Sequence, residues 1–297
     1  MSTLSKRDRK TLLYIVLIAL CVILIIFLLS RIKAEDKKEP ATVTTKGGSI
    51  TFFDVGQGDG ALIKDGDNEA IIDNGTPENA YDFCKKLKKM GVDDIEYMLL
   101  THNHDDHMGG SEAVANAFDI ENLFLPDLSG TKSPTRILTA VSEKVQNEGG
   151  AVSVAKSGLF YNVGEIKLSV LSAYYELSDE NDRSVIVIAE LNGKKFLFTG
   201  DAGSAAEKRM LGEGIDFDCD VLKVGHHGSK GSSTAAFLLE ATPLYAVISC
   251  GEGNVYRHPH DEALRRLVTS GAKVLRTDIC GDITFYADSE LHYKTEK

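Results

Sequence analysis

The sequence predicts an α/β domain of layered sheets with helices outside, preceded by a single transmembrane helix. After Gly48, short β-rich runs alternate with helical runs, which is the pattern of sheets covered by crossover helices. No internal repeat or low-complexity tract interrupts it, so residues 49–297 are interpreted as one domain. Ahead of this domain, residues 11–30 contain no charged side chain.

The apolar run has the length of a membrane span. About 20 apolar residues in a helix cross a hydrocarbon core of ~30 Å, and this run has no polar stripe of the kind a core helix shows. It exceeds the roughly 7–15 residues of a signal-peptide core, and no small-x-small cleavage site follows it. We therefore expect a retained anchor rather than a cleaved signal.

Basic residues are almost balanced on the two flanks of this helix, so charge alone does not orient it. The segment before the helix is too short to be an obvious translocated domain, so we expect it on the cytoplasmic side. We expect a cytoplasmic tail (1–10), an anchor (11–30), a linker (31–48) and an extracytoplasmic domain (49–297) on a single-pass cell-membrane protein.

Charge and cysteine content limit the partners of the domain. The net charge of the chain is −11, and the first 38 residues hold eight basic and three acidic side chains, which leaves −16 on the rest. Such a surface gains little from counterion release on nucleic acid unless metal or a local basic patch helps. The five cysteines lack zinc-finger spacing and are interpreted as small buried hydrophobes, with one disulfide left open outside the cell.

The local patterns define the expected elements in order. Asn192-Gly193 between two apolar runs predicts a β-hairpin. The expected strands are residues 49–55, 60–64, 69–73, 97–101, 122–125, 151–154, 159–161, 166–172, 184–191, 195–199, 219–224 and 245–249. The expected helices are residues 77–90, 110–118, 134–147, 232–240 and 261–269, with short strands after the last helix.

A histidine-rich segment at the carboxyl end of strand 97–101 carries the chemistry. In an extended segment, positions i and i+2 point the same way, so His102 and His104 are suited to share one metal ion. Asp106 and His107 follow one turn later and can reach a second ion. Two such ions activate a water and stabilise the leaving group of a displacement.

These residues resemble a known motif. His102-x-His104-x-Asp106-His107 is similar to the metal-binding motif of the metallo-β-lactamase superfamily, with Asp73 matching its upstream aspartate and Asp201 its metal-bridging carboxylate. More narrowly, segments 53–59, 224–229 and 256–260 resemble the hydrolase domain of ComEC-type competence proteins. The resemblance runs from about residue 49 to 288 and implies an αββα sandwich with two divalent ions at one sheet edge, zinc first and manganese as the alternative.

The resemblance also implies roles for later histidines. A histidine after strand 219–224 would complete the second metal site; His226 is preferred and His227 is the alternative, the other acting as a proton donor or substrate contact. His258 and His260 follow another strand and would face the same edge, or else be polar residues at a helix start, where Asp261 is a natural capping residue. His292 is given no role.

One departure from the superfamily pattern affects the first metal. Many members supply a third histidine between the motif and the bridging aspartate, and residues 108–200 contain none. A polar stretch, residues 180–184, stands there instead. Asp182 would approach the metal, or it belongs to a simple turn before a strand.

The glycine-rich turn at residues 56–60 is not a phosphate-binding loop. It lacks a following helix and a Lys-Ser or Lys-Thr pair. A tight turn beside the metals fits better, with Asp59 supporting the ligands from behind.

Three hypotheses for function follow. The first is a phosphodiesterase, with His227 or His258 as proton donor, that degrades single-stranded DNA during uptake together with a channel partner. The second is a cell-envelope hydrolase of small phosphodiesters, similar to phosphorylcholine esterases. The third is a metal-binding module with little catalysis, which the missing histidine favours and Asp106, His107 and Asp201 oppose.

Overall fold

The computed structural model describes residues 47–131, 136–288 and 290–297. The predicted tail (1–10), anchor (11–30) and nearly all of the linker (31–48) lie outside the described residues. Within the described part of the chain, no helix combines the length and apolarity that a membrane crossing needs.

The first sheet has eight strands. Their order is β15-β14-β1-β2-β3-β4-β5-β6, antiparallel from β15 to β3 and parallel from β3 to β6. The strands are β1 (Ser49–Phe52), β2 (Gly60–Asp65), β3 (Asn68–Asn74), β4 (Asp94–Leu99), β5 (Asp119–Leu125), β6 (Ala151–Val154), β14 (Ile283–Ala287) and β15 (Leu291–Thr295).

The second sheet has seven strands in the order β13-β12-β11-β10-β9-β8-β7. The predicted hairpin joins β9 to β10 through Asn192 and Gly193, with φ of 49° and 74°, as a type I′ turn requires. The strands are β7 (Phe160–Val163), β8 (Ile166–Ser172), β9 (Ile186–Leu191), β10 (Lys194–Phe198), β11 (Val221–Lys223), β12 (Tyr245–Ile248) and β13 (Lys273–Arg276).

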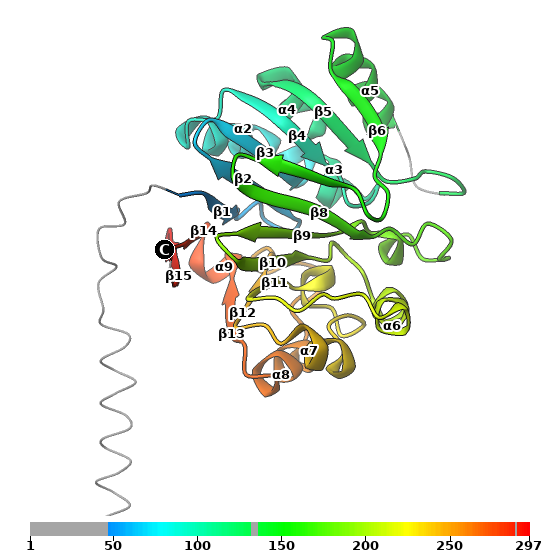
Figure 1. The fold of residues 1–297 in the computed structure, drawn as a ribbon, viewed down its shortest axis with the longest axis vertical. Coiled ribbons are helices and arrows are strands. Elements are labelled where there is room, and N and C mark those ends of the chain that lie inside the picture. Colours follow the sequence, from blue (N-terminus) through cyan, green and yellow to red (C-terminus); the bar gives the residue numbers. More distant parts are fainter. Residues whose placement is uncertain (1–46, 132–135, 289) are drawn as a thin grey trace, which may run out of the picture. The chain divides into compact units, whose positions relative to one another are not determined.

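Helices cover the outer face of each sheet, which confirms the αββα layering (Figure 1). Over the first sheet lie α2 (Ala80–Lys89), α4 (Ser111–Ala117) and α5 (Arg136–Asn147). Over the second lie α6 (Ser204–Glu213), α7 (Ala235–Ala241) and α8 (Asp261–Thr269). The remaining short helices are η1 (Pro77–Asn79), α3 (Asp105–Met108), η2 (Asn181–Arg183), η3 (Gly225–Gly228) and α9 (Thr277–Cys280).

Helix α6 was not predicted from the sequence. Its buried side includes Glu207 between Ala206 and Met210, so its apolar stripe is interrupted by a charge. The Glu207 carboxylate accepts hydrogen bonds from the backbone N–H groups of Ser233 and Thr234. A buried acid that ties two loops together therefore hides the helical pattern.

The cysteines of the described residues are all free. Cys84, Cys219 and Cys250 are buried and Cys280 is partly buried. The interpretation as small hydrophobes is confirmed for the three buried ones, and no disulfide is present among the described residues. Cys21 lies outside them.

Aromatic side chains lock the two sheets together. Phe52 of β1 stacks on Phe198 of β10, with ring centroids 5.4 Å apart, and meets Phe285 of β14 edge-on at 6.0 Å. Only 1% of the Phe52 surface is exposed. Strand β10 leads into the site described below. This contact therefore helps to fix the position of one sheet relative to the other near that site.

Truncating Phe52 is therefore expected to destabilise the fold strongly. Phe52→Ala should lower the free energy of unfolding by about 3–5 kcal/mol, through lost burial and the cavity left between the sheets. Chemical denaturation followed by circular dichroism measures this. Leu239→Ala, at a position 74% exposed on α7, is the control and should change stability by less than about 0.5 kcal/mol; equal effects would contradict the packing described here.

Candidate metal centre

The polar residues predicted from the sequence meet where strands of both sheets end. Asp73 lies at the end of β3, and His102 follows β4. Asp201 follows β10, and His226 and His227 follow β11 within η3. The backbone N–H of Val185 donates to the carbonyl of Thr101, which joins the two sheets at this edge. Loops at strand ends, held by rigid sheets, are where sites form.

Asp73 fixes the orientation of His107. Its φ is 56°, an uncommon backbone conformation for a residue with a side chain. Its carboxylate accepts hydrogen bonds from the N–H and hydroxyl of Thr101, both at 2.8 Å, and from His107 Nδ1 at 2.7 Å. With the proton on Nδ1, the lone pair of His107 is on Nε2, which lies 3.1 Å from Asp201 Oδ1.

His227 is oriented in the same way from the other side. Its Nδ1 donates to the carbonyl of Ser249 at 3.0 Å, which leaves Nε2 as the free ring atom. Nε2 lies 3.2 Å from Asp106 Oδ2 and 3.4 Å from Asp201 Oδ1. The loop reaches this position through positive φ values of 49° at His226 and 52° at His227, a strained turn of the kind that clusters at functional sites.

Three buried atoms at this point have no hydrogen-bond partner: His107 Nε2, His227 Nε2 and Asp201 Oδ1. Two ring lone pairs directed at a carboxylate oxygen repel it unless a proton or a cation lies between them. Nitrogen and carboxylate donors at these separations are the ligand types that bind divalent transition metals. The residues present therefore fit a divalent metal ion.

Asp59 belongs to the buried cluster but lies behind it. Its ligand-type atoms lie within 4.8 Å of those of His107, Asp201 and His227. However, its contacts are to the Nδ1 atoms of His227 and His107, at 3.2 and 3.8 Å, and to Lys223 Nζ at 2.6 Å. The side of each ring that Asp59 touches is opposite the free Nε2, so its geometry suits support of the histidines.

The charged groups of this cluster shift one another's pKa values. Burial alone lowers the pKa of His107 and of His227, but the carboxylate of Asp201 and its acidic neighbours raise both well above the ordinary value. Burial raises the pKa of Asp59, yet Lys223 and the two histidines bring it below its usual range. The surrounding carboxylates therefore favour positive charge at the two histidines.

His102 and His104 form a second group on the other side of Asp201. His102 Nε2 and His104 Nδ1 are 3.1 Å apart, as expected for ring nitrogens that face one point. Asp201 turns its other oxygen, Oδ2, toward His102 Nε2 at 4.0 Å. Burial, followed by the charge of His107, lowers the pKa of His102 well below normal, which keeps its ring neutral.

His226 approaches this second group and not the first. Its Nε2 lies 3.7 Å from Asp201 Oδ2, and 31% of its side chain is exposed. The two histidines of η3 thus address different oxygens of one carboxylate, Oδ1 for His227 and Oδ2 for His226. The sequence pattern favoured His226 as the ligand that joins Asp106 and His107. This geometry does not support that preference, because His227 is the histidine that lies beside them.

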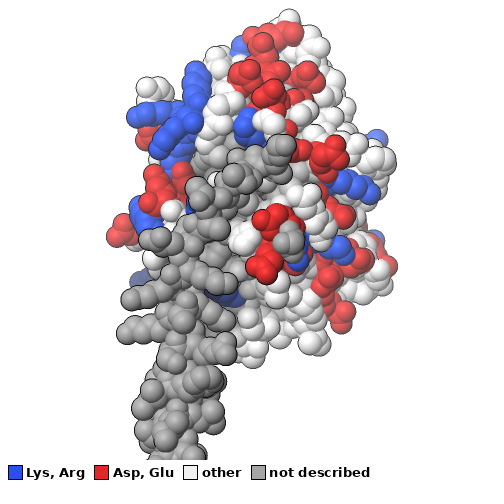
Figure 2. Space-filling view, turned by 60° about the vertical axis from the view of Figure 1, so that its left-hand side comes forward, with Lys and Arg blue, Asp and Glu red and all other residues white. Residues whose placement is uncertain are grey.

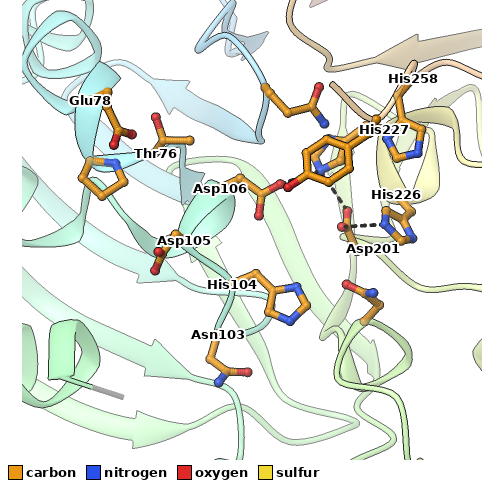
Figure 3. Close-up of a pocket in the computed structure, with 14 residues that line it drawn as sticks. Thr76, Glu78, Asn103, His104, Asp105, Asp106, Asp201, His226, His227 and His258 are labelled. Atoms are coloured by element: carbon orange, nitrogen blue, oxygen red, sulfur yellow. Dashed lines mark ion pairs between the residues drawn. The ribbon is translucent and has the colours of Figure 1, made fainter. Parts of the chain in front are cut away.

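An open cavity of about 590 Å³ lies over these residues (Figure 3). In Figure 3, Asp201, His226, His227 and His258 lie together on one side of it, with Asp106 facing them and His104 below. The lining residues are Gln57, Thr76, Pro77, Glu78, Asn103, His104, Asp105, Asp106, Asn181, Asp201, His226, His227, Tyr256 and His258.

His258 lines this cavity as a neutral imidazole. Half-burial, with His227 and His226 nearby, lowers the pKa of His258 to about 4. Its ring lies 5.4 Å from that of His226, and its Nδ1 is buried without a partner. His260 differs from His258, because it immediately precedes α8 and accepts a hydrogen bond from the Lys230 N–H. This position agrees with the second interpretation given above, a polar residue at a helix start.

Asp182 is not brought to the histidines. Its Oδ1 accepts from the backbone N–H groups of Gly203 and Ala206 at the start of α6. The expectation that it approaches a metal is therefore not supported by the structure, because the carboxylate is already engaged by a helix N-terminus. Its neighbour Asn181 lines the cavity instead, with a buried Oδ1 that has no partner.

Sequence reasoning missed several residues of this region. Lys223 left a signal, since a lysine inside the apolar run of β11 is a candidate for a buried ion pair. Gln57, Asn181 and Tyr256 stand in segments that the sequence singles out (53–59, 180–184 and 256–260) but were given no role of their own, and the folded chain brings them to one cavity.

Comparison with known proteins identifies the family. Residues 53–252 match the family model of the metallo-beta-lactamase superfamily, and the chain belongs to this superfamily. With its buried Asp–His cluster, it is a metal-dependent hydrolase by class. A metal-dependent hydrolase of Korarchaeum cryptofilum is 24% identical over 200 residues, covering 67% of this chain and 80% of that protein.

More similar relatives are competence proteins. ComE operon protein 3 of Bacillus subtilis is 28% identical over 258 residues, covering 80% of this chain and 33% of its own length. Competence protein ComA of Neisseria gonorrhoeae is 29% identical over 248 residues, covering 83% and 33%. The chain thus spans about a third of the length of these relatives, and the predicted resemblance to the ComEC type is confirmed.

Solved structures confirm the fold. Zinc-bound PqqB from Methylobacterium extorquens superimposes with a TM-score of 0.51 at 10% identity, covering 80% of this chain and 100% of that one. A variant of CmlA beta-hydroxylase gives 0.53 at 11% identity, covering 84% and 55%. At such identities these likenesses concern the fold alone.

The raised pKa values predict that metal binding releases protons. The pKa values of His107 and His227 are raised well above the ordinary value, and a histidine must lose its second proton to bind a metal. Zinc binding should release about two protons per chain and weaken as the pH falls from about 8 to 6. Calorimetry in buffers of different ionisation enthalpy counts these protons. His292→Ala, at an exposed ion pair, should leave the count unchanged, and heats independent of the buffer would contradict the assignment.

Proposed function

We propose that this chain is a membrane-anchored, extracytoplasmic phosphodiesterase that degrades single-stranded DNA, working beside a DNA-uptake channel. The observation that carries the hydrolytic part is the convergence of unpartnered His107, His227 and Asp201 atoms beneath an open cavity. The DNA part rests on the similarity to competence proteins over four-fifths of the chain. The anchor rests on residues 11–30 of the sequence.

The ligand assignment follows the two oxygens of Asp201. His107 and His227 face Oδ1, and Asp106 lies against His227 Nε2; these three residues would hold one divalent cation. His102 and His104 would hold the other on the Oδ2 side. His226 also faces Oδ2 and would supply the histidine that residues 108–200 lack. Zinc suits this nitrogen-rich set, and manganese is the alternative.

When bound, the two cations supply Lewis acidity to the scissile group and lower the pKa of a water molecule. The chain's own residues then orient the substrate. The cavity leaves His258 half-buried at its wall, and as a neutral ring it carries one N–H that can donate a hydrogen bond to the leaving oxygen. Asp73 and the Ser249 carbonyl hold the His107 and His227 protons on Nδ1 throughout.

The acidic balance of the chain does not exclude an anionic substrate. The face in Figure 2 carries Lys and Arg groups alongside Asp and Glu groups. Inside the cavity, the carboxylates of Asp106 and Asp201 are directed at the metal positions, where bound cations would neutralise them.

A small envelope phosphodiester is the second candidate. Glu78 and Asp105 line the cavity, and their charge disfavours a long polyanion more than a small ester with a cationic headgroup. A metal-binding module with little catalysis is the third. The approach of His226 to Asp201 weakens the argument for it, because the missing histidine then has a substitute.

Turnover separates the three. The full chain loaded with zinc or manganese should cleave single-stranded DNA, and Asp106→Ala combined with His107→Ala should reduce the rate by at least about 100-fold by removing ligands. Labelled DNA and a small choline phosphodiester are assayed side by side. Cleavage of the small ester alone would favour the envelope enzyme, and no turnover with either metal would favour the non-catalytic module.

A further inference from the structure

Tyr256 is an exposed aromatic side chain at the cavity that holds the candidate metal ligands. Its side chain is 60% exposed, and it lines the cavity together with Asp106, Asp201 and His227. Its ring stacks against that of His258, with centroids 5.8 Å apart and the two planes inclined by 22°. One face of the phenol is therefore supported by an imidazole that belongs to the same cavity.

The loop that carries Tyr256 is held in place. The Asn254 side chain donates to the carbonyls of Gly251 and His258 at 2.9 and 2.6 Å, and its oxygen accepts from the His258 N–H at 2.9 Å. The Arg257 N–H donates to the carbonyl of Asn254. These bonds close the loop on itself on both sides of the tyrosine.

The same loop is packed against the glycine-rich turn. The Gly251 N–H donates to Gln57 Oε1 at 3.3 Å, and a Cβ added at Gly251 would lie 2.7 Å from the Gln57 backbone nitrogen. The aromatic ring is thus presented on a fixed support, so little conformational freedom remains to be lost when a ligand stacks on it.

We propose that Tyr256 is the stacking platform for an unpaired nucleobase next to the scissile phosphodiester. This inference rests on the proposed phosphodiesterase function and names how its substrate is held. Every base has a π-face, so an aromatic platform binds without sequence preference. In a duplex those faces are already stacked on neighbouring bases, so this platform selects single strands. Arg257, the next residue along the chain, is exposed.

Two other roles for Tyr256 are distinguishable by substitution. If its hydroxyl donated a proton or a hydrogen bond, Tyr256→Phe would be as damaging as Tyr256→Ala. If the ring only packed the loop, its removal would act equally on substrates with and without bases. A stacking platform requires the ring but not the hydroxyl, and requires a base on the substrate.

The test measures binding of a labelled single-stranded oligonucleotide to the metal-loaded full chain by fluorescence anisotropy. Phosphorothioate linkages slow cleavage so that binding is measured by itself. Tyr256→Ala should weaken binding about 10-fold or more, and Tyr256→Phe less than about twofold. Val255→Ala, in the same loop and 88% exposed without lining the cavity, is the matched control and should bind as the unaltered chain does.

A second oligonucleotide carries abasic residues in place of the bases. The unaltered chain and Tyr256→Ala should bind it equally. An unchanged affinity of Tyr256→Ala for the base-bearing strand, an equal loss in Tyr256→Phe, or a loss that persists on the abasic strand would each overturn the proposal. Cleavage of an unmodified strand is followed separately, so absent turnover would count against the phosphodiesterase while leaving the binding result to decide on Tyr256.

Discussion

The structure of this site depends on one carboxylate, that of Asp201, which faces histidine nitrogens on both of its oxygens. Buried donors and acceptors are costly when unpaired, and three such atoms, on His107, His227 and Asp201, lie at one point. Their arrangement becomes favourable when positive charge occupies the space between them. The surrounding acids raise the pKa values of His107 and His227 for the same reason.

The surrounding fold serves to keep those nitrogens in place. Asp73, with its positive φ, binds Thr101 and His107 at the end of the first sheet. Ser249, which follows β12 of the second sheet, holds the His227 ring. Lys223 neutralises Asp59 behind both rings. Such outer partners set the tautomer and direction of metal ligands. The Phe52–Phe198 contact keeps the two sheets, and hence the two halves of the site, in register.

Much of this could be predicted from local sequence patterns. The hairpin at Asn192-Gly193, the strand-end position of the histidine motif and the layered α/β architecture depend on short-range signals and are confirmed. Helix α6 was missed because Glu207 is buried on its inner face. The positions of His226 and His227 could not be predicted, because they depend on a turn with two consecutive positive φ values. The position of Asp182 could not be predicted either, because it depends on the hydrogen bonds that its carboxylate accepts at the start of α6. The membrane anchor remains a prediction.

We propose that Asp201 lies between two metal positions, with His227 on one side and His226 on the other. Crystals of the zinc-loaded protein, measured on both sides of the zinc absorption edge, test it most directly. We expect two anomalous peaks, one bonded to Asp106, His107 and His227 and the other to His102, His104 and His226, with Asp201 between them. A single peak, or two peaks with His226 remote from both, would contradict the account.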